Sequence, residues 1–218
     1  MKKFLKNNSL SLVFFILFLL SLGGQVVTGL KQHNQEMEEK GGQQLNMSQY
    51  FTSGQFLQST FENWESEFLQ MALFVILTMF LYQKGSSESK DPEKKEEVDR
   101  EPNPRRRNAP WPVKKGGLVL AIYKHSLFYA LTIIFILSFL LHWYGRLKDY
   151  NEEQILKQLP TETAFQYISN SRMWFESFQN WQSEFLSVFA IVVLSIFFRE
   201  KGTPQSKPVD APDSETGG

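Results

Sequence analysis

The sequence predicts an all-α fold: an integral membrane four-helix bundle made of two parallel tandem repeats of a two-helix hairpin. Two observations carry this prediction. Four dense apolar runs are each about long enough to cross a bilayer, and the chain matches itself at an offset of 117 positions. Composition agrees with both, because Phe alone supplies 20 of the 218 residues and the polar residues gather between and after the runs.

The four apolar runs cover approximately residues 10–30, 64–82, 126–144 and 181–198. A helix needs roughly 20 apolar residues to cross a hydrocarbon core about 30 Å thick, and it pairs its own backbone polar groups there. The first run follows a basic N-terminus, so a secretory signal peptide is the alternative. Its length and the lack of a small-residue cleavage site after it favour an uncleaved helix.

The distribution of Lys and Arg predicts the orientation. These residues gather before the first run, between the second and third runs, and just after the fourth run. Loops rich in Lys and Arg stay in the cytoplasm, so both termini are predicted to be cytoplasmic. The predicted organisation is a first repeat over residues 1–83, a charged cytoplasmic linker over 84–116, a second repeat over 117–198 and a disordered cytoplasmic tail over 199–218.

The internal duplication aligns residues 9–90 with residues 126–207 without a gap. Its densest block pairs FENWESEFL at 61–69 with FQNWQSEFL at 178–186, and seven of these nine positions are identical. Two apolar segments that resemble each other by chance would not keep Asn, Trp, Ser and Glu in register. Each repeat holds an even number of predicted crossings, which gives the two copies the same orientation and predicts a pseudo-two-fold axis along the membrane normal.

Two acidic residues lie inside predicted spans, where polar side chains are costly and suggest a function. Glu67 and Glu184 occupy corresponding positions, and each lies about one helical turn inside the outer boundary. Asn63 and Asn180 precede them by four positions and share their helix faces. The pseudo-two-fold axis would bring the two carboxylates together, where the pair would hold a proton or a cation.

The first and third runs offer one further polar position. Gln25 in the first copy aligns with His142 in the second, also near the outer end, and both would join the same outer-leaflet cluster. In the alternative interpretation, Glu67 and Glu184 reach the headgroup layer, where a carboxylate near a helix N-terminus also favours the helix dipole. The sequence leaves both interpretations open.

Aromatic residues lead into the second and fourth runs. They predict part-helical interfacial segments at the headgroup level, whether as anchors or as a lid over a site. The residues are Tyr50, Phe51, Phe56, Phe61 and Trp64 in the first copy, and Phe165, Tyr167, Trp174, Phe175, Phe178 and Trp181 in the second.

Several classes of function find no support in the sequence. The chain has no Cys, which excludes disulfides, thiol catalysis and thiolate metal sites. Its formal net charge of zero gives no electrostatic argument for nucleic acid. No phosphate loop, dinucleotide fingerprint, zinc-protease helix or nucleophile elbow occurs. We therefore expect no enzyme activity, cofactor or metal. The expected partners are the lipid bilayer and a second copy of the chain, because four helices make a thin bundle.

Several blocks of the sequence carry a resemblance to a known family. They are FENWESEFLQM at 61–71, KGSSESKDP at 84–92, APWPVKKGG at 109–117, YNEEQ at 150–154 and WFESFQNWQSEFL at 174–186. With these blocks the chain resembles a family of small bacterial membrane proteins catalogued only as a domain of unknown function. The resemblance implies a location in the bacterial inner membrane, and it implies no activity.

The predicted function is that of a multi-pass inner-membrane protein that is not an enzyme and acts through lipid or protein contacts. The alternative is a small transporter or channel that uses the paired Glu residues at the repeat interface. The direction in which those two side chains point separates the alternatives.

Overall fold

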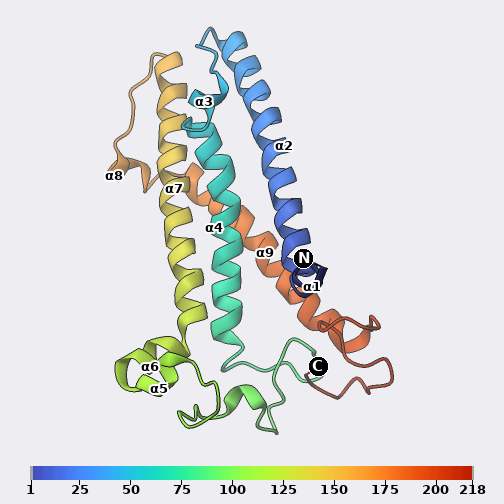
Figure 1. Ribbon diagram of the computed structural model, residues 1–218. Helices are drawn as coiled ribbons and strands as arrows, with labels where there is room; N and C mark the ends of the chain where they lie inside the picture. Colours follow the sequence, from blue (N-terminus) through green and yellow to red (C-terminus); the bar gives the residue numbers. More distant parts are fainter. Residues whose placement is uncertain (1, 218) are drawn as a thin grey trace. The chain divides into compact units, whose positions relative to one another are not determined.

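The computed structural model describes residues 2–217, and every regular element in that range is helical (Figure 1). The all-α class is therefore confirmed for the described residues. The four long helices are α2 (Ser9–Lys40), α4 (Gly54–Leu77), α7 (Ser126–Leu156) and α9 (Ser171–Phe197). The short ones are α1 (Lys2–Asn7), α3 (Met47–Tyr50), the 3₁₀ turn η1 (Glu97–Asp99), α5 (Trp111–Lys115), α6 (Gly117–Lys124) and α8 (Ala164–Tyr167).

Three of the long helices, α2, α7 and α9, are long and apolar enough to cross a membrane. Most of their apolar side chains are exposed, as expected for surfaces that face lipid. The fourth predicted crossing, residues 64–82, is not among these helices within the described range. Its helix, α4, already ends at Leu77, so every stretch of it long enough to cross a bilayer includes Glu62, Glu65 and Glu67.

The chain divides into two compact units. The first unit comprises the described parts of residues 1–61 and 140–173, and the second comprises those of 62–139 and 174–218. Helices α4, α7 and α9 contribute residues to both units.

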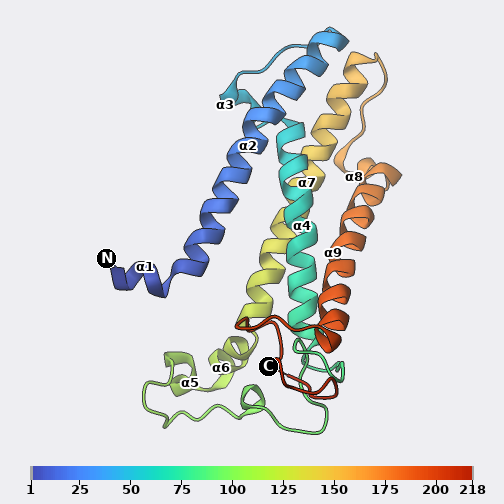
Figure 2. The same ribbon diagram turned by 90° about the vertical axis from the view of Figure 1, so that its right-hand side faces the viewer.

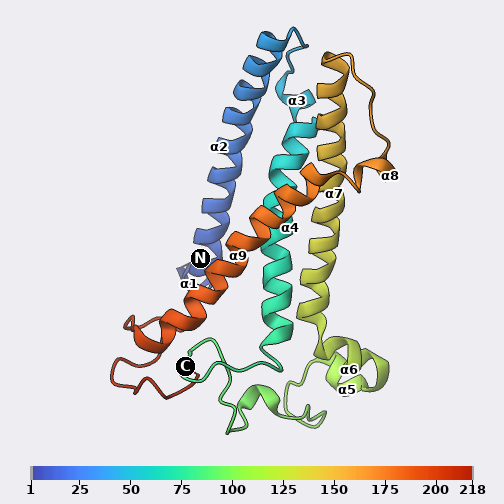
Figure 3. The same cartoon turned by 180° about the vertical axis from the view of Figure 1, so that it is seen from behind.

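In the first unit, α4 packs closely against α7 through two glycines. A methyl group on Gly54 would lie 2.3 Å from the backbone nitrogen of Asp149, and one on Gly145 would lie 2.5 Å from the backbone nitrogen of Gln58. Small residues at such a crossing let two helix backbones approach. The ribbons of α4 and α7 accordingly run side by side in Figures 1 and 3.

A pair of hydrogen bonds closes the loop that follows each long helix of the first unit. The Asn34 side chain donates to the Leu45 carbonyl at 2.9 Å and accepts from the Leu45 backbone N–H at 2.7 Å. The Asn151 side chain makes the same two bonds with Glu162, both at 2.8 Å. The two loops, 117 positions apart, thus share one hydrogen-bonding pattern.

Short helices follow these loops at the predicted aromatic segments. Asn46 and Gln49 form a capping box at the start of α3, and Thr163 and Gln166 form the corresponding box at the start of α8. Each helix ends on a buried tyrosine, Tyr50 in α3 and Tyr167 in α8. The predicted part-helical character of these segments is therefore seen, and an Asn or Thr followed three positions later by Gln explains where each helix starts.

In the second unit, the residues after α9 contact the linker that follows α4. The side chain of Thr216 accepts from the Gly85 backbone N–H at 2.8 Å, and the Gly217 backbone N–H donates to the Ser86 carbonyl at 3.0 Å. The Lys207 ammonium donates to three carbonyls of the tail, those of Pro212, Asp213 and Glu215. The sequence predicts disorder for this tail, whereas these bonds give it a defined path (Figure 2).

Candidate acidic site on α4 and α9

The site lies in the second unit, where α9 crosses the face of α4 (Figure 3). Its residues come from the two most similar blocks of the duplication, 61–69 on α4 and 178–186 on α9. The indole N–H of Trp181 donates to Oε1 of Glu65 at 2.9 Å. Glu65 is 0% exposed, so this bond is one that stabilises a buried carboxylate.

Two further contacts join the same helices. The side-chain amide of Asn180 donates to the carboxylate of Glu62. An electrostatic interaction also joins the carboxyl groups of Glu67 and Glu184, which lie on the same two helices. Asn63, by contrast, is exposed at its side chain, and its backbone carbonyl accepts from the Ser66 hydroxyl at 2.9 Å.

The Glu67–Glu184 pair has particular chemistry because both groups are acids. Two neighbouring carboxylates repel each other when both are ionised, and a shared proton or a cation between them relieves that repulsion. Glu67 is exposed and Glu184 is half-buried, so the pair is accessible from outside the protein. The two carboxyl groups can therefore bind and release a proton or a small cation.

Both acids lie in the interior of their helices. Glu67 is about 20 Å along the helix axis from Gly54 at 1.5 Å per residue, and Glu184 lies midway along α9. The sequence-based alternative relied partly on the dipole at a helix N-terminus, and that effect fades within the first turn. It therefore does not explain these positions. The residues before each acid are largely polar and those after it largely apolar, so each acid sits where the helix changes character.

The remaining predicted site residues, Gln25 and His142, belong to the first unit. The Gln25 side chain donates to the hydroxyls of Ser59 and Thr60, at 3.2 Å and 3.1 Å. His142 is fully buried. The sequence places Gln25 in one outer cluster with the acids, whereas in the structure its partners are two hydroxyl groups of α4.

The sequence did not assign Glu62 and Glu65 to the site, and it placed Trp181 only among the interfacial aromatic residues. A signal for them was present, because the nine-residue blocks differ at only two positions, Glu62 against Gln179 and Glu65 against Gln182. These two glutamates are the ones whose carboxylates accept from Asn180 and Trp181. The difference between the copies therefore coincides with contacts between them.

The comparisons with known proteins place the chain in a family. A family model, described as a domain of unknown function (DUF6766), matches residues 1–218. The chain belongs to this family. Because the DUF6766 model matches this chain over its whole given length, the acidic site and the loops described above all lie within the family's domain. No curated protein and no solved structure matches the chain.

Proposed function

We propose that this DUF6766 protein crosses a bacterial inner membrane four times, as two parallel copies of a helical hairpin with both termini in the cytoplasm. The three membrane-length helices, the 117-position duplication and the placement of Lys and Arg support this arrangement. The matched hydrogen bonds of Asn34 and Asn151 support the equivalence of the two copies. Helix α4 supplies the remaining crossing, with its acidic residues turned toward α9.

We further propose that the protein is not an enzyme and that it moves a proton or a small cation through the Glu67–Glu184 pair. The observation that carries this proposal is the hydrogen bonding of the two acidic blocks of α4 and α9 to each other, through Asn180–Glu62 and Trp181–Glu65. An ionisable pair inside a membrane segment stays charged only at a large cost unless it binds something positive. The pair combines one acid from each copy, so a single site serves the whole chain.

Flux through reconstituted liposomes tests this proposal. The wild type and the double variant Glu67→Gln/Glu184→Gln are compared under a pH gradient, and then under sodium and potassium gradients. Glu200→Gln, in the exposed segment after α9, is the matched control because it makes the same acid-to-amide change outside the site. Transport predicts flux in the wild type and the control and its loss in the double variant. Equal flux in all three proteins would remove the pair from the mechanism.

A role through contacts alone is the second candidate, and the exposed apolar surface favours it. Phe14, Phe15 and Leu20 are among many large apolar side chains exposed along α2, and only 6% of that helix's most apolar stretch is buried. Such a surface packs against lipid or against another membrane helix. A folded preparation without flux for protons, sodium or potassium would favour this candidate.

A further inference from the structure

The first unit contains a polar cavity that is partly open to solvent. Its volume is about 110 Å³. Because liquid water occupies about 30 Å³ per molecule, the cavity has room for one ion with a few waters. Helices α2 and α7 supply most of its wall, and α4 and α9 contribute one residue each. The wall comprises His33, Glu36, Met37, Lys40, Gln55, Asp149, Glu152, Glu153, Leu156 and Arg172.

Three groups in this wall have unused capacity to accept a hydrogen bond or bind a metal. His33 is 2% exposed, and its Nε2 has no hydrogen-bond partner among the described residues. The buried Oε1 of Gln55 is likewise without a partner in the described part of the chain. The carboxylate of Glu152 makes no hydrogen bond or ion pair to any residue within 2–217. Buried polar atoms are normally satisfied, so the unpartnered atoms of His33 and Gln55 at one cavity point to a bound species, and the half-buried Glu152 adds a carboxylate to them.

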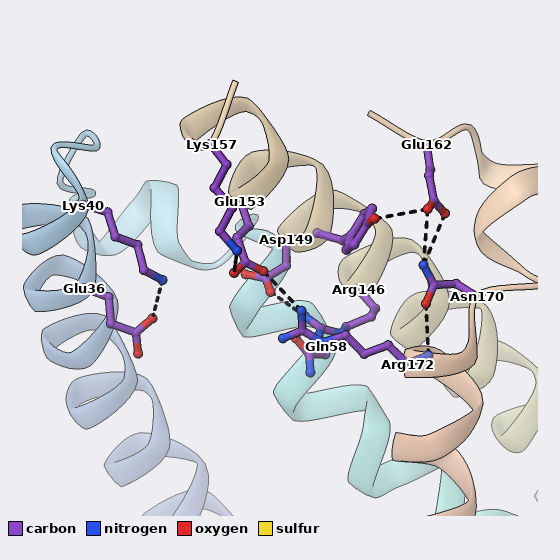
Figure 4. A network of polar contacts seen from close by, with 11 residues as sticks. Glu36, Lys40, Gln58, Arg146, Asp149, Glu153, Lys157, Glu162, Asn170 and Arg172 are labelled. Carbon is purple, nitrogen blue, oxygen red and sulfur yellow. Dashed lines mark hydrogen bonds and ion pairs between the residues drawn. The ribbon is translucent and has the colours of Figure 1, made fainter. Parts of the chain in front are cut away.

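The other charged groups of the wall already have partners. Lys40 lies 3.8 Å from Glu36, and Arg172 lies 3.2 Å from Glu153 (Figure 4). The carboxylate of Asp149 accepts from the guanidinium of Arg146, a residue next to the cavity, at 2.6 Å. These pairs leave the negative charge of Glu152 without a counter-charge. A cation bound in the cavity would therefore supply the counter-charge that Glu152 lacks.

The second copy provides an internal comparison. The duplication aligns His33 with Tyr150 and Gln55 with Arg172. The Tyr150 hydroxyl donates to Glu162 at 3.1 Å, and the Arg172 guanidinium donates to Glu153 at 3.2 Å. Both of these positions in the second copy are thus satisfied by carboxylates of the protein itself. Only the first copy places an imidazole nitrogen and an amide oxygen, both unpartnered, at the same cavity.

We propose that this cavity binds a divalent transition-metal ion, with His33 Nε2, Gln55 Oε1 and the Glu152 carboxylate as its protein ligands. A set with an imidazole nitrogen suits Zn²⁺, Co²⁺ or Ni²⁺, whereas Mg²⁺ and Ca²⁺ prefer sites made of oxygen alone. Three protein ligands leave a fourth position of a tetrahedral ion for water. This site is independent of the Glu67–Glu184 pair, and its existence does not depend on transport.

Calorimetric titration of the full, untagged chain tests this site. The protein is purified in detergent, stripped with a chelator and titrated with ZnCl₂, with and without excess MgCl₂. We expect saturable binding of one equivalent that MgCl₂ does not displace. His33→Gln and Glu152→Gln should each weaken the affinity by about tenfold or more, since each removes one of three ligands. His125→Gln is the matched control, because it removes a histidine from outside the cavity and should leave the affinity unchanged.

Either of two results overturns the proposal. Absence of saturable Zn²⁺ binding means that water alone fills the cavity. Binding that survives His33→Gln or Glu152→Gln with unchanged affinity assigns the ion to other residues. Size-exclusion elution shows whether each variant is folded. Glu152→Gln keeps the size of the side chain, so its titration decides the matter if His33→Gln fails to fold.

Discussion

The close crossing of α4 and α7 leaves no room for a side chain at Gly54 or Gly145. In Gly54→Ala, the new methyl group would lie 2.3 Å from a backbone nitrogen and 2.7 Å from the Cα atom of Asp149. Because these are backbone atoms, no side-chain rotation relieves the contact, and the helices must shift. Overpacking of this kind costs about 1–3 kcal/mol. Gly145→Ala meets Gln58 and Leu57 in the same way and should cost a similar amount.

Gly23→Ala is the matched control, because an added methyl group at Gly23 meets nothing within 4 Å. In a helix interior, this change should be neutral or stabilise the protein by up to about 1 kcal/mol. The assay is thermal unfolding in detergent, followed by circular dichroism and by loss of the monodisperse size-exclusion peak. We expect Gly54→Ala and Gly145→Ala to lower the midpoint by about 3–10 °C. Midpoints equal to that of Gly23→Ala would refute close packing at this crossing.

Three further predictions concern the second unit. Trp181→Phe removes the donor to the buried Glu65 carboxylate and should destabilise the protein by about 1.5–3 kcal/mol in the same unfolding assay, and an unchanged midpoint would contradict the bond. In the linker, a hydrogen bond from Lys90 lowers the pKa of Asp99 below its ordinary value of 3.8, so Lys90→Gln should raise that pKa in a carboxyl NMR titration. The contribution of the Lys90–Asp99 ion pair to stability is therefore complete above pH 3.8 and is lost as the pH falls through the lowered pKa. An Asp99 pKa that is the same in Lys90→Gln and in the wild type would show that the ion pair does not form. Lys207→Met removes the ammonium that holds three tail carbonyls, so limited proteolysis should cut the tail faster than in the wild type, and equal rates would argue against a held tail.

Much of the fold follows from local patterns in the sequence. Long apolar runs predict α2, α7 and α9, because length and hydropathy alone determine whether a helix can cross a bilayer. The short helices α3 and α8 follow from capping residues three positions apart, since such a pair satisfies the free backbone groups of the first turn. The end of α4 at Leu77 was not predicted, because residues 78–82 are as apolar as the helix itself and nothing in the pattern marks a stop.

The candidate site was predictable in part. The alignment of the two copies assigned Glu67 and Glu184 to equivalent positions, because equivalence between repeats needs only sequence register, and their facing each other stays a prediction. The contacts made by Glu62 and Glu65 depend on how α9 is rotated about its own axis, and hydropathy does not determine that rotation. The ligand groups of the cavity were also missed, since His33, Gln55 and Glu152 are far apart in sequence and only the folded first unit brings them to one wall.

The proposed transport requires one acid from each copy to act in a single shared site. The most direct measurement is proton flux into liposomes by Glu67→Gln, by Glu184→Gln and by the double variant, compared with the wild type. A shared site predicts that either single substitution removes as much flux as both together, because residues that act as one unit are not additive. Partial losses in the single variants that sum to the loss in the double variant would contradict the claim.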